Sequence, residues 1–362
     1  MNIFTFPECL DQLNKFYKLY DSSTIIVATD NHNNQLRSQD ERVCRYCGLS
    51  YPKVFFNNDA HIISQLLGKN SLLCDYECDD CNATFSKYES AFVNWLGITR
   101  TLSGTKNRKN KVPEYVSNAG TVKANLYTVL NAEGTLISKQ PDEKDAFKID
   151  VETGTATITY LKRPYIPYNV YRVLLKIAFS ALNEEEVADY AHVLQMLVHP
   201  KTNSELSKFA HIISTRLPMD QQALYPYGLL FKKRNPTAKI PLHFFIFYFA
   251  NHVYSFPLPF SNQDFKNNCY SPLETVFPPP VFFEQPPANS MVTAKLEFMG
   301  STEKVKDDQE MVGFQFNPAD FANLTAFDPK SGEKQAYTFN PETIVSFFMV
   351  EQGKELKVPK KE

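Results

Sequence analysis

The sequence contains no hydrophobic run long enough to form a membrane-spanning helix. Its most apolar stretch, residues 241–260, has an apolar core at residues 242–250, whereas a helix needs about 20 apolar residues to cross ~30 Å of hydrocarbon. The run is rich in aromatic residues and is broken by Asn251, His252 and Pro257, a pattern that favours strands. We therefore expect no membrane span.

Two other features are scarce or missing. Residues 1–21 lack the basic segment and the small-residue cleavage site of a secretory signal peptide, so we expect a cytoplasmic protein. The formal net charge is only -2, which excludes a globally basic surface, so any contact with nucleic acid must come from local patches. Apart from one pentapeptide, the chain has no internal repeat.

The composition is that of a globular protein. Apolar residues make up 43% of the 362 residues, enough for sizeable cores. At about 100 to 200 residues per domain, this length indicates two or three domains.

The most informative pattern is a pair of C-x2-C motifs, Cys44 with Cys47 and Cys78 with Cys81. Two intervening residues let one tight turn present both sulfurs to a single ion, and two such turns complete a tetrahedral shell, so we expect a structural Zn2+ site with no open position for water. The alternatives are disulfides or unrelated buried thiols. Cys74 could be a spare ligand, although a small buried thiol is the simpler interpretation. Cys9 and Cys269 have no partner pattern.

The residues between and around these cysteines carry a family resemblance. The stretches CRYCG (44–48), AHIISQLLGKN (60–70) and ECDDCNATFSKYE (77–89) resemble the HNH, or ββα-metal, endonuclease family in its zinc-bearing form. The resemblance implies a metal-dependent endonuclease that hydrolyses phosphodiester bonds, with DNA as the expected partner. By analogy with the settings of such modules, bacterial defence or restriction is the expected role.

The resemblance also implies roles for individual residues. His61 would be the general base, Asn70 would brace the loop around it, and Asn82 would bind a catalytic Mg2+ or Mn2+. Phosphodiester hydrolysis needs a water molecule deprotonated near neutral pH, which a neutral imidazole can provide. It also needs a hard cation on the phosphate oxygens, for which amide and carboxylate oxygens are suitable ligands.

The sequence departs from the family pattern immediately before the histidine. The family commonly has Asp, Glu or His there as a metal ligand, whereas this chain has Ala60. Asp59 would point to the opposite side of a strand. Glu89 follows Asn82 by two helical turns and would lie on the same face, so we expect it to serve as the substitute ligand.

A different class of function remains open. The chain could be a catalytically silent zinc-containing module that binds nucleic acid or protein, with His61 as an ordinary polar residue. An RNA substrate is a further possibility, because nothing in the chain reads the 2′-hydroxyl. The pentapeptide AHIIS recurs at 210–214 without cysteines, and Leu206, Phe209, Ile213 and Leu217 there fall at helical spacing, so we expect His211 to be unremarkable in a helix.

A basic segment follows the motif. It has no acidic residue and contains Arg100, Lys106, Arg108, Lys109 and Lys111. A polynucleotide backbone would be attracted to it, although a solvated flexible loop has the same composition. Its place beside the nuclease-like motif favours DNA binding.

These observations predict an α+β protein in which a small zinc-braced ββα-metal (HNH-like) module precedes a larger α+β domain. We expect an accessory segment at 1–40, the nuclease module at 41–112, and at 113–362 an α+β domain that recognises substrate, partner or signal. An oligomer or a partner protein is compatible with this organisation. The element pattern predicts helices at 9–20, 85–97, 168–182 and 183–199, and strands at 24–29, 122–130, 133–139 and 155–167. The last three strands are expected to form one small antiparallel sheet.

Overall fold

The computed structural model describes residues 4–129, 132–199, 204–218, 221–269, 276–282, 292–316, 325–327, 334–336, 344 and 346–350. The chain divides into two compact units built from interleaved segments. Unit 1 comprises Met1–Trp95, Thr105–Lys111 and Tyr165–Val305, and unit 2 comprises Leu96–Gly104, Val112–Pro164 and Lys306–Glu362. These boundaries differ from the consecutive segments 1–40, 41–112 and 113–362 expected from the sequence.

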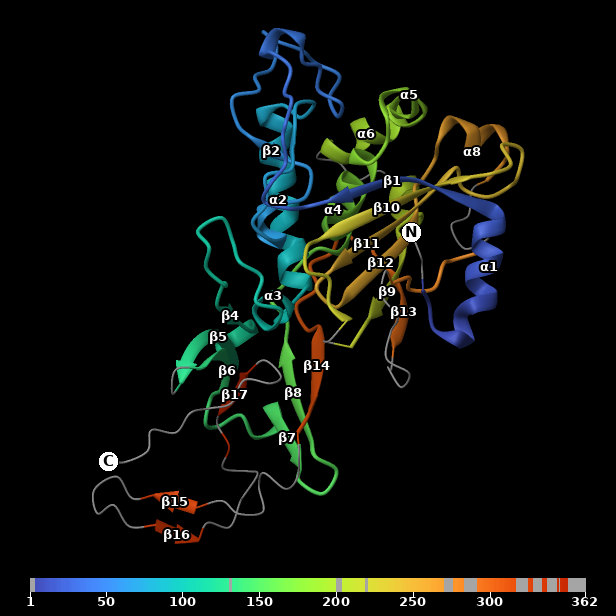
Figure 1. Cartoon of the computed structure of the whole chain (residues 1–362). Coiled ribbons are helices and arrows are strands. Elements are labelled where there is room, and N and C mark those ends of the chain that lie inside the picture. Colours follow the sequence, from blue (N-terminus) through green and yellow to red (C-terminus); the bar gives the residue numbers. More distant parts are fainter. Residues whose placement is uncertain are drawn as a thin grey trace. The chain divides into compact units, whose positions relative to one another are not determined.

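Unit 1 contains a six-stranded sheet in which every pairing is antiparallel (Figure 1). The strands lie in the order β1 (Tyr20–Val27), β10 (Tyr227–Lys233), β11 (His243–Phe249), β12 (His252–Pro257), β9 (His211–Arg216) and β13 (Thr293–Phe298). The aromatic run near 241–260 therefore forms strands, as predicted, and β11 and β12 are buried along their whole length.

Both faces of this sheet are covered by helices, which explains the continuous apolar run. Phe16 of α1 (Leu10–Leu19) contacts Phe244 on one face. Adjacent side chains of a strand point to opposite faces, and Phe245 pairs with Phe256, which contacts Tyr171 of α4 on the other face. A strand buried on both sides has no polar face, so it does not alternate in hydropathy.

The remaining helices of unit 1 are α2 (Asp79–Trp95), α4 (Pro167–Ser180), α5 (Glu184–Val187), α6 (Ala191–Val198), α7 (Ser204–Lys208) and α8 (Asn262–Lys266). Helices α2 and α4 pack against each other. The predicted helices at 9–20, 85–97 and 168–182 are confirmed, and Gly97, just after α2, has the positive φ of 58° expected of a helix-ending glycine. The predicted 183–199 helix is divided into α5, a 3-10 turn and α6. Asn183 caps α5 by accepting from the Glu186 amide at 2.9 Å.

Unit 2 is built mainly from two antiparallel sheets. One contains β17 (Ser346–Val350), β6 (Ala132–Lys139), β5 (Val122–Val129) and β4 (Tyr115–Val116), and the other contains β14 (Gln309–Gln315), β8 (Thr155–Leu161) and β7 (Phe147–Asp150). Strands β5, β6 and β8 form as predicted, but β8 does not join the sheet of β5 and β6. Its neighbours β7 and β14 bury Ile158 and Tyr160 in the core of the unit. Helix α3 (Thr99–Leu102) and the pair β15 (Thr325–Phe327) and β16 (Lys334–Ala336) complete its described elements.

Short 3-10 turns join several of these elements: Pro7–Cys9, Gln39–Glu41, Gln65–Leu67, Asn118–Gly120, Lys144–Ala146 and Ala188–Tyr190. Among the described residues, no helix is both long and apolar enough to cross a membrane. The proline-rich connector between residues 272 and 287 lies largely outside the described residues.

The prediction of a helix around the second AHIIS pentapeptide is wrong. Helix α7 ends at Lys208, and His211 begins strand β9. This strand is bonded to β12 on one side and to β13 on the other. Pairing with two neighbours satisfies its backbone groups, and this tertiary environment outweighs the helical spacing of its apolar residues.

Candidate metal centre and histidine site

The four cysteines of the two C-x2-C motifs converge in unit 1. Their sulfurs all lie within 4.8 Å of one another. The Sγ atoms of Cys44 and Cys81 are 3.6 Å apart, and those of Cys47 and Cys78 are 3.8 Å apart. Sulfurs placed tetrahedrally at ~2.3 Å from zinc would be separated by about 3.8 Å. The donor set and its spacing therefore fit a structural zinc ion.

Local backbone geometry presents these sulfurs. In the first motif, the Cys44 amide donates to the Leu49 carbonyl at 2.8 Å, and the Gly48 amide donates to the Cys44 carbonyl at 2.8 Å. Gly48 has a φ of 72°, a conformation that a side chain would strain. In the second motif, Cys81 lies in the first turn of α2, so a turn and a helix start hold the two thiol pairs.

The disulfide alternative is excluded by the same geometry. All seven cysteines lie in the described part of the chain, and all are free thiols. The Sγ separations of 3.6 and 3.8 Å are far longer than a disulfide bond of ~2.05 Å. Cys74 lies outside the cluster, where its buried thiol faces Glu77 at 3.8 Å, and burial raises its pKa. It is therefore a buried thiol and not a spare ligand.

The clustered thiols do not ionise alike. Hydrogen bonding with Cys78 is the largest cause that lowers the pKa of Cys44. Hydrogen bonding with Cys44 raises the pKa of Cys81. The first thiolate thus suppresses ionisation of its neighbours, and a bound cation would be required to make all four sulfurs thiolates.

The candidate general base lies on a small hairpin that precedes α2. His61 ends strand β2 (Ala60–His61), which pairs antiparallel with β3 (Leu73–Cys74). Asn70 lies in the connection between these strands and is buried, with 4% of its surface exposed. Strands β2 and β3 are thus followed in the chain by helix α2.

Asn70 holds the hairpin connection and the histidine together. Its Nδ2 donates to the carbonyls of Ile63 and Gly68, each at 3.0 Å, and its Oδ1 accepts from the Leu72 amide at 3.1 Å. These bonds fix the orientation of the amide, so Oδ1 faces His61 Nδ1 at 3.2 Å. Asn70 therefore links the hairpin connection to the His61 ring, and its role in catalysis stays a prediction.

This contact determines the state of the imidazole. Because Oδ1 of Asn70 carries no proton, Nδ1 of His61 must donate, and in the neutral ring Nε2 bears the lone pair. Burial is the largest cause that lowers the pKa of His61 from 6.5. Among the described residues, Nε2 has no hydrogen-bond partner. The ring is therefore neutral at physiological pH, with its basic nitrogen available.

Glu89 is engaged elsewhere in the structure. Its Oε2 accepts a hydrogen bond from Ser64 Oγ at 2.7 Å, and its Oε1 lies 3.4 Å from Nζ of Lys176. Lys176 also contacts Glu77 at 3.2 Å. The carboxylate expected to replace the missing metal ligand is therefore the counter-ion of a buried lysine.

The residues expected to hold a catalytic divalent cation do not form a ligand cluster comparable to the four cysteines. Ala60 is buried and has no ligand atom, and Asp59 is exposed. Asn82 follows Cys81 in α2 and is half-buried. Apart from the four cysteines, the described residues contain no group of three or more His, Cys, Asp and Glu side chains placed to hold a metal. The residues present do not fit a catalytic Mg2+ or Mn2+ site made of such ligands.

The basic segment is divided between the two units. Arg100 belongs to unit 2, where burial lowers the pKa of its guanidinium to about 10. The other cations, Lys106, Arg108, Lys109 and Lys111, are exposed in unit 1. The Lys106 carbonyl accepts from the amide of Lys69, the residue before Asn70, at 2.8 Å. The exposed part of the segment therefore lies beside the hairpin connection that holds His61.

Sequence reasoning missed Lys176, Glu77 and Ser64, whose contacts organise this region. Ser64 is close to His61 in the chain, but Lys176 lies 87 positions from Glu89. The spacing of neighbouring residues in the sequence cannot indicate a contact between positions so far apart. Comparison of the chain with models of protein families, with curated proteins and with solved structures found no match.

Proposed function

We propose that the chain is an HNH-like endonuclease that hydrolyses phosphodiester bonds, with DNA as its expected substrate. The observation that carries the proposal is the His61–Asn70 contact of 3.2 Å on a hairpin followed by a helix. Activation of water requires a histidine whose ring is oriented by a hydrogen bond at Nδ1 and whose Nε2 is free to accept a proton. Two cysteines of the zinc-type cluster, Cys78 and Cys81, lie at the start of the same helix.

His61 is assigned one chemical step. Its neutral Nε2 would remove a proton from the attacking water, and burial favours the neutral ring because it lowers the pKa. A divalent cation would supply charge stabilisation on phosphate oxygens in this class of reaction. Because the described carboxylates and histidines do not form a site for it, we assign no step to the cation.

The exposed basic loop supports a polyanionic substrate. Lys106, Arg108, Lys109 and Lys111 project from a loop bonded to Lys69, next to Asn70. These cations would attract a phosphate backbone toward the hairpin, and the attraction would weaken as salt rises. Nothing on this loop distinguishes DNA from RNA. A setting in bacterial defence, a partner protein and a cytoplasmic location remain predictions from the sequence.

A second candidate is supported by a specific observation. Ala60 supplies no ligand, and Glu89 is held by Lys176 and Ser64. A module that kept its zinc site but lost its catalytic cation would have this arrangement. It would bind nucleic acid or protein through the basic loop without cleaving.

The deciding experiment is cleavage of supercoiled plasmid, single-stranded DNA and RNA, each with Mg2+, Mn2+ or a chelator. The His61→Ala variant is compared with His211→Ala, because both histidines lie in the same pentapeptide but His211 is in strand β9. Zinc content and circular dichroism confirm that each variant is folded. Cleavage lost only in His61→Ala supports the nuclease. Cleavage that persists in His61→Ala overturns it, and salt-dependent DNA binding without cleavage favours the silent module.

A further inference from the structure

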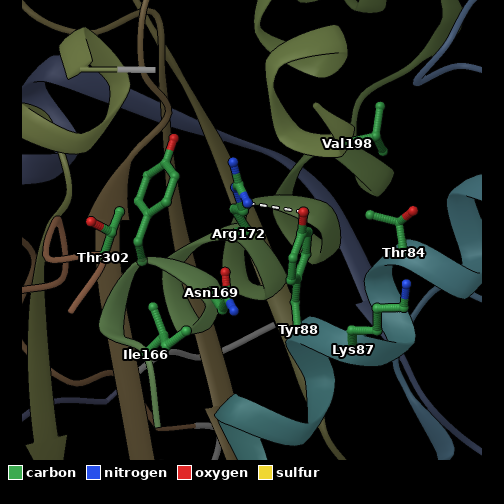
Figure 2. Close-up of a pocket in the computed structure, with 9 residues that line it drawn as sticks. Thr84, Lys87, Tyr88, Ile166, Asn169, Arg172, Val198 and Thr302 are labelled. Atoms are coloured by element: carbon green, nitrogen blue, oxygen red, sulfur yellow. Dashed lines mark hydrogen bonds between the residues drawn. The ribbon is translucent and has the colours of Figure 1, made fainter. Parts of the chain in front are cut away.

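A pocket of about 510 Å³ lies in unit 1 (Figure 2). Side chains of α2, α4 and α6 contribute to it. The residues that line it are Thr84, Lys87, Tyr88, Ile166, Tyr168, Asn169, Arg172, Val198 and Thr302. Sites for small organic ligands have volumes of about 300 to 1,000 Å³. The pocket therefore has room for more than a single inorganic ion.

The lining has a definite charge character. Lys87 and Arg172 are cations, and none of the lining residues is acidic. The hydroxyls of Thr84 and Thr302 and the amide of Asn169 add neutral hydrogen-bonding groups. Cations without carboxylates in a concave site create a positive potential, which selects an anionic ligand.

Arg172 is buried without an acidic partner. Only 3% of its surface is exposed. Its Nη1 donates to Tyr88 Oη at 2.9 Å and its Nη2 donates to the His199 carbonyl at 3.1 Å, both neutral acceptors. The guanidinium also lies over the rings of Tyr88 and Tyr168, at 4.8 and 4.5 Å from their centroids.

Lys176, four residues further along α4, is also buried but has acidic partners. Lys176 has two carboxylates, at 3.2 and 3.4 Å. Within the part of the chain that the structure describes, Arg172 has no carboxylate at ion-pair distance, and its Nε has no hydrogen-bond partner. A buried cation is costly unless an opposite charge compensates it. A ligand anion would supply that charge.

We propose that this pocket binds a phosphate monoester, with the phosphate at Arg172 and Lys87. A planar guanidinium suits phosphate oxygens, and the lysine at the rim adds a second charge. Thr84, Thr302 and Asn169 would bind polar groups of the remainder of the ligand. The monoester could be that of a free small molecule or the 5′ end of a nucleic acid strand.

The pocket is distinct from the histidine site, although α2 contributes to both. Thr84, Lys87 and Tyr88 are spaced three and four residues apart and share one face of the helix. Glu89, which contacts Ser64 near His61, lies about 100° or more around the helix from each of them. Ligand binding in this pocket therefore does not require nuclease activity at His61.

The test is calorimetric titration of the full chain with four probes: adenosine 5′-monophosphate, adenosine, a short 5′-phosphorylated single-stranded DNA and the same DNA without the phosphate. Binding is expected only for probes with a phosphate monoester. Lys87→Gln, at an exposed position, should weaken it by at least about tenfold, the loss expected for one charge-assisted hydrogen bond. Lys18→Gln, exposed on α1, is the matched control and should bind like the wild type.

Because Arg172 is buried, its replacement can damage the fold. The binding test therefore uses substitutions of Lys87 and Thr302. Thr302→Val is also at an exposed position and should weaken the same probes. Binding of the phosphorylated DNA alone would identify the nucleic acid end as the source of the monoester. No binding of either phosphorylated probe at millimolar concentration would overturn the proposal. Equal binding of both DNA probes, or equal affinity of Lys87→Gln and Lys18→Gln, would also overturn it.

Discussion

Nζ of Lys176 in α4 lies 3.2 Å from Oε1 of Glu77, and both side chains are almost completely buried. Burial by itself would lower the pKa of Lys176, but Glu77 and Glu89 reverse this effect and raise it, so the ammonium group stays charged. Burial raises the pKa of Glu77, although the charge of Lys176 opposes this effect. The ion cluster links α4 to the cysteine module (residues 44–95) within unit 1.

Replacing Lys176 by Met should destabilise the protein by about 3 to 5 kcal/mol, because the buried carboxylate of Glu77 and the half-buried carboxylate of Glu89 would lose their counter-ion. Urea unfolding measures the change. Lys208→Met is the matched control, since Lys208 is exposed and its contact with Glu205 is on the surface; it should cost less than about 1 kcal/mol. Adding Glu77→Gln to Lys176→Met should recover part of the loss. Equal stability of the two lysine variants would contradict the role of the cluster.

Replacing Cys78 and Cys81 by Ser should remove bound zinc and unfold the cysteine module. The reason is that structural zinc sites of this kind contribute an apparent ~10 to 16 kcal/mol of binding free energy in small peptides. Atomic absorption measures the zinc content, and proteolysis reports unfolding. Cys9→Ser, outside the cluster, should keep one zinc per chain. Retention of stoichiometric zinc by the double variant would rule out the four-cysteine site.

Neutralising Lys106, Arg108, Lys109 and Lys111 together as Gln should reduce the salt dependence of DNA binding. Each lost phosphate contact lowers the slope of log affinity against log salt by about 0.9 for duplex DNA and ~0.7 for single strands. Fluorescence anisotropy at several salt concentrations gives the slope. Arg100→Gln is a useful comparison, because burial of Arg100 makes it unsuited to a phosphate contact. An unchanged slope in the fourfold variant would separate this loop from nucleic acid binding.

The sequence was most informative where structure is determined locally. The C-x2-C spacing places the two thiols of each motif close together. The aromatic residues of the predicted helix, spaced three or four apart, form the buried face of α2: Phe85, Tyr88, Phe92 and Trp95. The same is true of Asn70, whose bonds to Ile63, Gly68 and Leu72 all lie within seven residues. Turn geometry and helix periodicity depend on neighbours in the chain, so they can be inferred without the fold.

Contacts between distant segments could not be inferred in this way. The pairing of β1 with β10, which places the N-terminal segment in the main sheet, joins residues about 200 positions apart, such as Tyr20 and Lys233. The pentapeptide AHIIS shows the limit directly. The first copy begins in the short hairpin of β2 and β3, whereas residues 211–214 of the second copy lie within β9, which pairs with two neighbouring strands. The same five residues therefore take a structure that depends on the strands that pair with them.

Glu89→Gln should lower stability by about 1 to 3 kcal/mol, because the carboxylate would no longer compensate Lys176 or accept strongly from Ser64. If Glu89 is only a counter-ion, the Mg2+ concentration that gives half-maximal cleavage should stay the same. A metal titration of the cleavage rate decides this. Ser64→Ala, which removes only the hydroxyl that donates to Glu89, is the control. A markedly higher Mg2+ requirement in Glu89→Gln alone would instead make Glu89 the substitute metal ligand.

The pH dependence of cleavage should report the neutral form of His61. Burial is the main cause that lowers its pKa from 6.5, so the base stays unprotonated to a lower pH than a free histidine. The rising limb of log kcat/KM should therefore be centred below pH 6.5. In the same window the unfolded chain binds more protons, so the stability that His61 contributes is fully present above pH 6.5 and lost as the pH falls through the folded pKa. An NMR titration of the His61 ring, assigned with His61→Ala, measures this pKa independently. A kinetic limb at or above pH 6.5, or one that differs from the NMR value, would show that another group is the base.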